Sequence, residues 1–277
     1  MKKSNAIHFM LVIMFIHYSC TGITAHEFWI EPKNFIVKSS EEISGNLFVG
    51  QMMKGASYGY YPRNFKRFEI KTKNGIKSLT GRLGDNPAIK IPAQGDSLVT
   101  IIHATTHNTV FYNNWSTFDK FLTEKNLTSI KTKHVQSNFP KKQFTEIYSR
   151  YAKALIGSGT SAGMDQKTGL EIELVLKENP YTQDITNGLT IELFYKGLPR
   201  VDTQIEIFSR DTHNIISRKI LFTNKLGKAI IQVQPQTDYM INAVVMRQPA
   251  HYETVTADST QQALWESLWA SISFKVP

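Results

Sequence analysis

The stretch LTIELFYKGLPRVDTQIEIFSRDTHNIISRKILFTNKLGKAIIQVQPQTDYMINAVVM, residues 189–246, decides the fold class. Apolar, β-branched and aromatic residues occur there in runs of five to eight, with turn-forming residues between the runs. We expect strands at residues 189–194, 204–208, 217–223, 229–233, 239–246 and 270–276. So many short strands within about a hundred residues predict an Ig-like or transthyretin-like β-sandwich over residues 181–277.

Residues 26–180 show the same kind of pattern, with a helical interruption. We expect strands at residues 26–30, 36–37, 42–49, 65–73, 97–103, 110–111 and 171–177. Turn signals such as Asn74-Gly75 lie between them and favour hairpins. The chain is therefore predicted to be mainly β, with an N-terminal β-sandwich domain at 26–180, a second β-sandwich domain at 181–277 and a short helical insertion in the first.

The helical insertion is predicted from a change in the spacing of apolar residues. One short helix is expected around residues 116–125, with Ser116 as its cap. A second helix is expected around residues 143–156, because apolar side chains recur there at intervals of three and four. Arg150 and Lys153 could bind a carboxylate or a phosphate, but an amphipathic helix normally places such residues on its solvent-exposed face.

The first 25 residues have the three-part layout of a secretory signal peptide. Lys2 and Lys3 precede an apolar stretch at residues 6–16, which is too short to cross a bilayer, and small residues end at Ala25. Cleavage after Ala25 would leave a periplasmic or secreted protein that begins at His26 and has no transmembrane segment. An uncleaved membrane anchor is the alternative.

Composition limits the kinds of partner and of metal site. The formal charge of +9 falls to +7 when Lys2 and Lys3 leave with the signal peptide. We expect a solvated basic surface and no nucleic-acid partner, because the protein is exported. The one cysteine, Cys20, lies in the signal peptide, and the bulky residues before it disfavour lipid attachment. Without a thiol, the mature chain can bind a metal only through nitrogen or oxygen ligands.

Five segments, in order along the chain, resemble a family of exported bacterial proteins. They are HEFWIEP at 26–32, VGQMMKG at 49–55, EIYSRYAKALIG at 146–157, GLEIELVLKENPY at 169–181 and WESLWASISF at 265–274. That family is classed as a domain of unknown function, and many members carry the label of periplasmic components of nickel or cobalt uptake. The resemblance implies an N-terminal β-sandwich with an inserted helical segment, a second β-sandwich and a link to transition-metal uptake. The presence of Arg150 and Lys153 in the third segment further implies a structural ion pair with Glu171 or Glu173.

His26 is the first candidate metal ligand. Signal cleavage would leave a histidine whose free α-amine and imidazole Nδ1 can close a chelate on one metal ion. Copper(II) and nickel(II) favour such nitrogen-rich sites. A free amine has an unperturbed pKa of about 7.7–8.0, so it sheds its proton easily at neutral pH. The alternative is that His26 only starts the first strand.

Further ligands must come from elsewhere in the chain. His103 and His107 lie four residues apart in an expected strand, roughly 13 Å from each other, so one ion cannot take both unless the strand bends. We select His103, which is equally compatible with a half-buried structural role, and His251, which lies in a loop. His134 and His213 are expected on the solvated surface.

Three classes of function follow from these residues. The first is a binding protein that captures a divalent transition metal (nickel, cobalt or copper), or a complex of one, and presents it to an envelope metal transporter. The second is a structural or adhesion-type β-sandwich module without a ligand. The third is an oxidative enzyme with a copper ion at His26. No motif of a catalytic nucleophile or phosphate loop is present, so we expect a binding protein rather than an enzyme.

Overall fold

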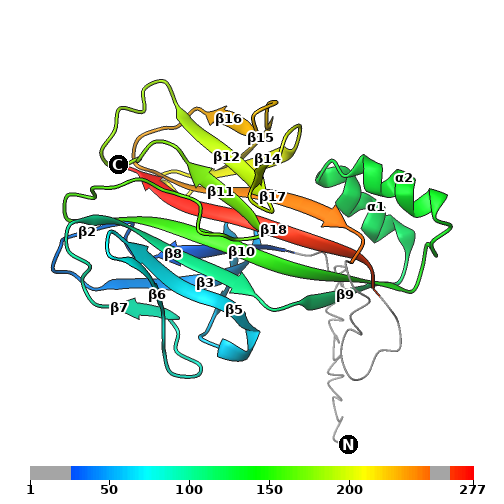
Figure 1. The fold of residues 1–277 in the computed structure, drawn as a ribbon, viewed down its shortest axis with the longest axis horizontal. Helices are drawn as coiled ribbons and strands as arrows, with labels where there is room; N and C mark the ends of the chain where they lie inside the picture. Colours follow the sequence, from blue (N-terminus) through cyan, green and yellow to red (C-terminus); the bar gives the residue numbers. More distant parts are fainter. Residues whose placement is uncertain (1–25, 250–262) are drawn as a thin grey trace, which may run out of the picture.

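The computed structural model describes residues 26–249 and 263–277, and most of them lie in β-strands (Figure 1). The strands are β1 (Glu27–Pro32), β2 (Ile36–Val37), β3 (Ile43–Gln51), β4 (Lys54–Tyr58), β5 (Phe65–Thr72), β6 (Gly75–Ser78), β7 (Ile89–Ile91), β8 (Ser97–Thr105), β9 (Asn108–Tyr112), β10 (Phe144–Ser158), β11 (Ile172–Leu176), β12 (Leu189–Tyr195), β13 (Leu198–Pro199), β14 (Gln204–Arg210), β15 (Ile216–Phe222), β16 (Lys228–Ile231), β17 (Thr237–Arg247) and β18 (Ala263–Val276). The helices are η1 (Pro62–Asn64), α1 (Trp115–Glu124) and α2 (Thr128–Gln136). The predicted mainly β, sandwich-like class is confirmed.

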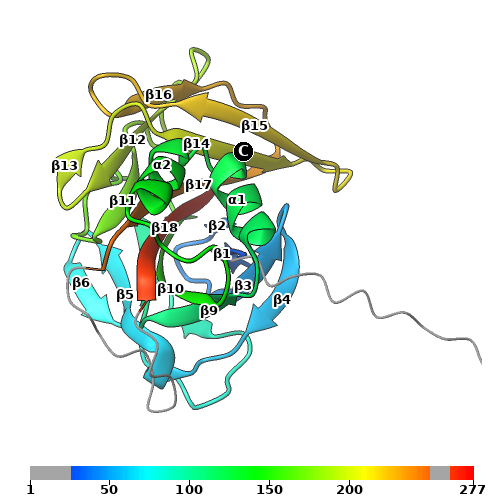
Figure 2. The same cartoon turned by 90° about the vertical axis from the view of Figure 1, so that its right-hand side faces the viewer.

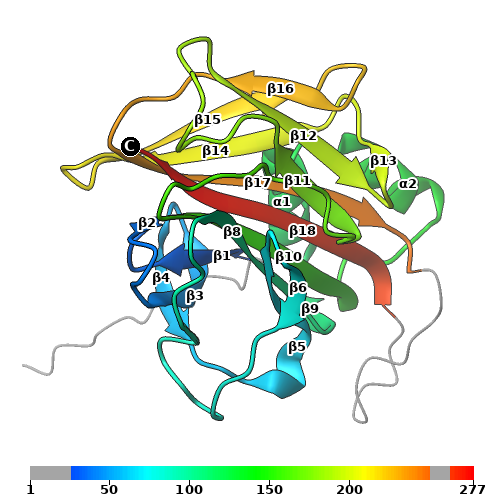
Figure 3. The same ribbon diagram turned by 60° about the vertical axis from the view of Figure 1, so that its left-hand side comes forward.

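Three sheets lie in layers, with the largest in the middle (Figures 1 and 3). The central sheet has the order β15-β14-β17-β18-β10-β8-β5-β6, and β2 and β9 also pair with β10. One of its faces packs on a sheet of β1, β3, β4 and β7, through a core that includes Ile30 and Ile156 and that we call the β1-side core. The other face packs on a sheet of β11, β12, β13 and β16, through a core that includes Leu155 and Ile191.

The helix predicted around residues 143–156 is wrong: these residues form the strand β10. β10 pairs in parallel with β18 and antiparallel with β8 and β9, so both of its edges are hydrogen-bonded. Both faces are buried as well, with Ile156 on one side and Leu155 on the other. Apolar residues therefore occur on both faces, and the alternation that would distinguish a strand from a helix is lost.

The β10–β18 pair joins residues 26–180 to residues 181–277, the two segments that we predicted as separate domains. Strands β5, β6, β8, β9 and β10 come from residues 26–180, and strands β14, β15, β17 and β18 come from residues 181–277. Figure 3 shows β18, in red, running beside β10, in green. β18 therefore lies inside the central sheet, between β17 and β10.

The two α-helices cover one end of the central sheet (Figure 2). α1 confirms the helix expected around residues 116–125, but its N-cap is Asn114 rather than Ser116. α2 was not predicted, because its polar sequence has little apolar periodicity. Phe121 of α1 stacks on Trp269 of β18, with ring centroids 5.5 Å apart. Neither α-helix of the described ranges has the length and apolar character that a membrane crossing requires.

Candidate functional site

His26 lies at one end of the β1-side core. β1 directs Phe28 into this core, and the alternation of a strand puts His26 on the same side. β8 and β10 direct His103 and Arg150 to that side by the same rule, since Val99 and Ala152, four and two residues away, are core members. Two of the three predicted ligands, His26 and His103, thus face the same end of the β1-side core. Arg150 faces it too.

The His103 imidazole is enclosed by aromatic rings. Its side chain is 1% exposed, and neither ring nitrogen has a hydrogen-bond partner among the described residues. The rings of Phe28, Phe65 and Phe68 lie 4.6 to 5.4 Å from it, centroid to centroid. Burial lowers the pKa of His103 to about 3, so the ring is neutral at physiological pH. Neutral imidazole is the form that binds metals and that both donates and accepts a hydrogen bond.

His26 also has an unsatisfied nitrogen. Its Nδ1 is buried, and no described residue hydrogen-bonds to it. Its carbonyl oxygen accepts a hydrogen bond of 3.2 Å from Nη2 of Arg150, which fixes the backbone at the start of β1. A buried polar atom without a partner costs free energy unless a ligand or water satisfies it.

Arg150 brings positive charge to this end of the core. The residue is 8% exposed, its guanidinium lies 4.6 Å from the ring centroid of Tyr148, and its Nε has no hydrogen-bond partner. No carboxylate of the described residues forms an ion pair with it. Burial lowers the pKa of Arg150 from its ordinary value, against smaller opposing effects of Tyr148, Tyr58 and Glu27. Sequence reasoning placed this residue on the wet face of a helix, whereas its side chain is buried.

A cavity of about 60 Å³ lies beside His103 and Arg150. Its wall includes His103, Arg150, Tyr58, Asn64, Phe65 and Asn108. Tyr58, Asn64 and Phe65 come from the β4–β5 connection, far from His103 in the sequence, and no spacing pattern could have linked them to it. Within the described ranges, no group of three or more His, Cys, Asp and Glu side chains is arranged to hold a metal ion.

None of the other described histidines lines this site. His251, the third predicted ligand, lies outside the described residues. His107 is exposed beyond the end of β8, and His213 is exposed in a turn, as expected. The surface position predicted for His134 is wrong: the residue is fully buried, Nδ1 accepts a 2.9 Å hydrogen bond from Nε1 of Trp265, and burial lowers its pKa.

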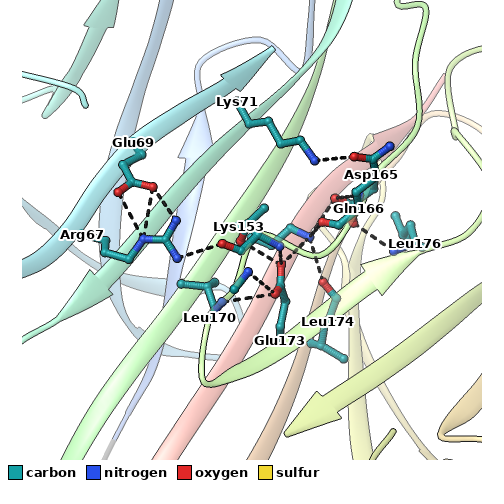
Figure 4. A network of polar contacts seen from close by, with 12 residues as sticks. Arg67, Glu69, Lys71, Lys153, Asp165, Gln166, Leu170, Glu173, Leu174 and Leu176 are labelled. Carbon is teal, nitrogen blue, oxygen red and sulfur yellow. Dashed lines mark hydrogen bonds and ion pairs between the residues drawn. The ribbon is translucent and has the colours of Figure 1, made fainter. Parts of the chain in front are cut away.

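Lys153 is the centre of a second polar cluster, shown in Figure 4. Its side chain is 1% exposed, and Nζ lies 2.7 Å from Asp165 and 3.2 Å from Glu173, whose side chains are equally buried. The predicted ion pair with Glu173 is confirmed, whereas the predicted exposed position is wrong. Because Lys153 projects from the central sheet to the loop and strand around β11, this cluster ties two layers together. Backbone N–H groups of residues 168–170 also donate to Glu173, and that of Leu176 donates to Asp165. Because the protein itself supplies partners for these buried groups, we assign the cluster to structure.

Glu146 is a third buried charge centre, at the start of β10. The residue is fully buried, and its carboxyl group accepts hydrogen bonds from Tyr112 (2.9 Å) and from Ser267. Burial raises the pKa of Glu146 to about 7, although both hydrogen bonds oppose the shift. Because protein hydroxyl groups satisfy both of its carboxyl oxygens, we assign Glu146 to stability rather than to ligand binding.

Comparison with known proteins gives a family but no function. No curated protein matches the sequence. A solved structure described as "Crystal structure of tetra-tandem repeat in extending region of large adhesion protein" matches with 9% identity and a TM-score of 0.21, covering 91% of this chain and 50% of that chain. The present protein thus spans about half the length of the matched one, and a TM-score this low does not establish a shared fold. Residues 23–247 match the family described as a domain of unknown function, DUF4198, and the chain belongs to that family.

Proposed function

We propose that this protein is exported and binds a divalent transition metal (nickel, cobalt or copper) through His26, for delivery to an envelope transporter. The observation that carries the proposal is the buried, unpartnered Nδ1 of His26. This is the nitrogen that closes a chelate with the α-amine once the signal peptide is cleaved after Ala25. The periplasm or the cell exterior is the compartment that the proposal requires.

His103 is the next ligand in the proposal. It is assigned to the same end of the β1-side core, and both of its ring nitrogens lack partners. Because its pKa is lowered to about 3, no proton competes with a metal for this imidazole at neutral pH. The ring of Phe28, on β1, lies 5.0 Å from the His103 ring, centroid to centroid, so a conformational adjustment of the first residues on binding could bring His26 to His103. His251 is the candidate for a fourth nitrogen.

Calorimetric titration with nickel(II) and copper(II) tests the proposal. A protein beginning at His26 should bind about one ion per chain, whereas the same protein with an acetylated α-amine should bind much more weakly. Acetylation turns the amine into an amide and adds no new terminal amine, and it leaves the imidazole unchanged. Mass spectrometry of the exported protein establishes whether the chain begins at His26.

Variants of the other histidines complete the experiment. His103→Phe and His251→Ala should each weaken binding if the residue is a ligand. His213→Ala is the matched control, because His213 is exposed in a turn away from this site. Equal affinity with and without acetylation of the α-amine would refute the chelate. Absence of binding to either form would favour a structural module without a ligand.

A further inference from the structure

A buried guanidinium without a carboxylate partner is unusual in a folded protein. Arg150 is 8% exposed; its guanidinium donates a hydrogen bond to the His26 carbonyl and interacts favourably with the Tyr148 side chain, over whose ring it lies. Its Nε–H is buried and donates to no described residue. Other half-buried arginines of this chain, such as Arg247, are each paired with carboxylates. Arg150 is thus held in place with part of its hydrogen-bonding capacity unused.

The cavity beside Arg150 offers space for the missing partner. Its volume of about 60 Å³ is larger than the roughly 30 Å³ that one water molecule occupies in the liquid. Phe28, Phe65 and Tyr58 form apolar parts of its wall, and His103 presents an imidazole with two unused nitrogens. The wall contains no carboxylate that could compete for the guanidinium.

We propose that this cavity, which we call the Arg150 pocket, binds the carboxylate group of a small anionic ligand. A guanidinium presents its N–H groups in a planar fork that matches a carboxylate, and the hydrogen bonds are charge-assisted. The His103 ring supplies one further N–H donor, and Asn108 also lines the pocket. The apolar rings of the wall lower the local dielectric constant, which strengthens these polar contacts.

The inference deepens the proposed function and, in one of its two forms, rests on it. A divalent metal at His26 would lie close to the positive charge of Arg150, which is bound to the His26 carbonyl. Like charges in a buried site repel, so an anionic co-ligand between them would make both sites more favourable. The carboxylate can therefore be free, or it can be coordinated to the metal; the pocket chemistry is the same in both cases.

Acetate is the probe for the pocket itself. The protein beginning at His26, free of metal, is titrated with acetate, and the Arg150 Nε–H signal is followed by NMR. We expect saturable binding. Arg150→Lys, which keeps the charge but loses the fork, should weaken binding by roughly 10- to 100-fold, the factor expected for a hydrogen bond to a charged group. His103→Phe, which removes the ring N–H and keeps an aromatic side chain, should also weaken it.

A second titration separates the two sources of the carboxylate. The affinity of the protein beginning at His26 for nickel(II) is measured by calorimetry with and without acetate. Because coupling between two ligands is reciprocal, an increase shows that the carboxylate is a metal co-ligand, and no change shows that the pocket takes a free carboxylate. Acetate affinity that is the same in Arg150→Lys and in the parent, or no saturable binding in either protein, overturns the inference. Loss of nickel binding with retained acetate binding refutes the metal site alone.

Discussion

Removal of the Lys153 side chain is the perturbation whose effect the structure predicts most sharply. Its Nζ pairs with Asp165 and Glu173 and also donates 3.2 Å hydrogen bonds to the carbonyl groups of Gln166 and Leu174. Lys153→Ala would leave two carboxyl groups, each 1% exposed, without their cation. Breaking a buried ion pair from one side typically costs about 3–5 kcal/mol, and we expect a loss in this range.

Lys225→Ala is the matched control for Lys153→Ala. Lys225 pairs with Asp202 at 2.6 Å, nearly the distance between Lys153 and Asp165, but the two side chains are 83% and 61% exposed. Exposed pairs contribute about 0–1 kcal/mol, so this variant should lose little. Urea unfolding of the two variants measures both losses. Equal and small losses would contradict the buried position of Lys153.

The pH dependence of a charge-only variant separates charge from packing. Lys153→Met keeps most of the side-chain volume and removes the charge. Burial raises the pKa of Asp165, and Lys153 opposes that shift, so in the variant the folded-state pKa of Asp165 rises further. A raised carboxyl pKa stabilises the fold at low pH and loses this contribution as pH rises. The difference in stability between variant and parent should therefore shrink on acidification. A difference independent of pH would indicate lost packing instead.

Three further substitutions test other parts of the fold. Glu146→Gln should flatten the pH profile of the unfolding free energy between about pH 4.5 and 7, because the raised pKa of Glu146 gives stability at low pH that is lost as pH rises through about 7. At about 1.4 kcal/mol per pKa unit, the pH-dependent part of the unfolding free energy that the variant loses is at most roughly 3 kcal/mol, and urea unfolding at several pH values measures it. Tyr151→Ala should cost about 3–5 kcal/mol in the same assay, since this ring is 5% exposed in the core between β10 and β12, and a loss below about 1 kcal/mol would contradict its burial. Trp265→Phe should cost about 1–3 kcal/mol by leaving Nδ1 of His134 without its donor, whereas an unchanged midpoint of thermal unfolding would contradict that hydrogen bond.

Strands with one exposed face could be predicted from the sequence, and strands with two buried faces could not. β12 alternates buried and partly exposed residues, and its predicted range, 189–194, lies within one residue of the observed one. β10 buries nearly all of its fifteen residues, so its sequence carries no polar face. The parallel partner of β10 is β18, more than a hundred residues later, and no local pattern shows that pairing.

Some residues of the candidate site could be selected from the sequence, and others could not. His26 and His103 could be selected from the sequence because imidazole nitrogen is a ligand type whose chemistry is visible in one residue. The contribution of Arg150 depends on where its side chain points, and the helix predicted around residues 143–156 directed it to solvent. His134 was misplaced for a related reason: its partner, Trp265, lies on β18, and the aromatic cluster that encloses it forms from distant segments.

The metal position is the most direct test of the proposed function. Crystals of the protein beginning at His26, grown with one equivalent of copper(II), would give an anomalous difference peak for the metal. We predict one peak at the start of β1, within roughly 2 Å of the α-amine and of Nδ1 of His26, the usual length of a bond between a metal and an imidazole nitrogen. A peak at other residues, or no peak while His26 Nδ1 contacts only protein atoms, would contradict the account.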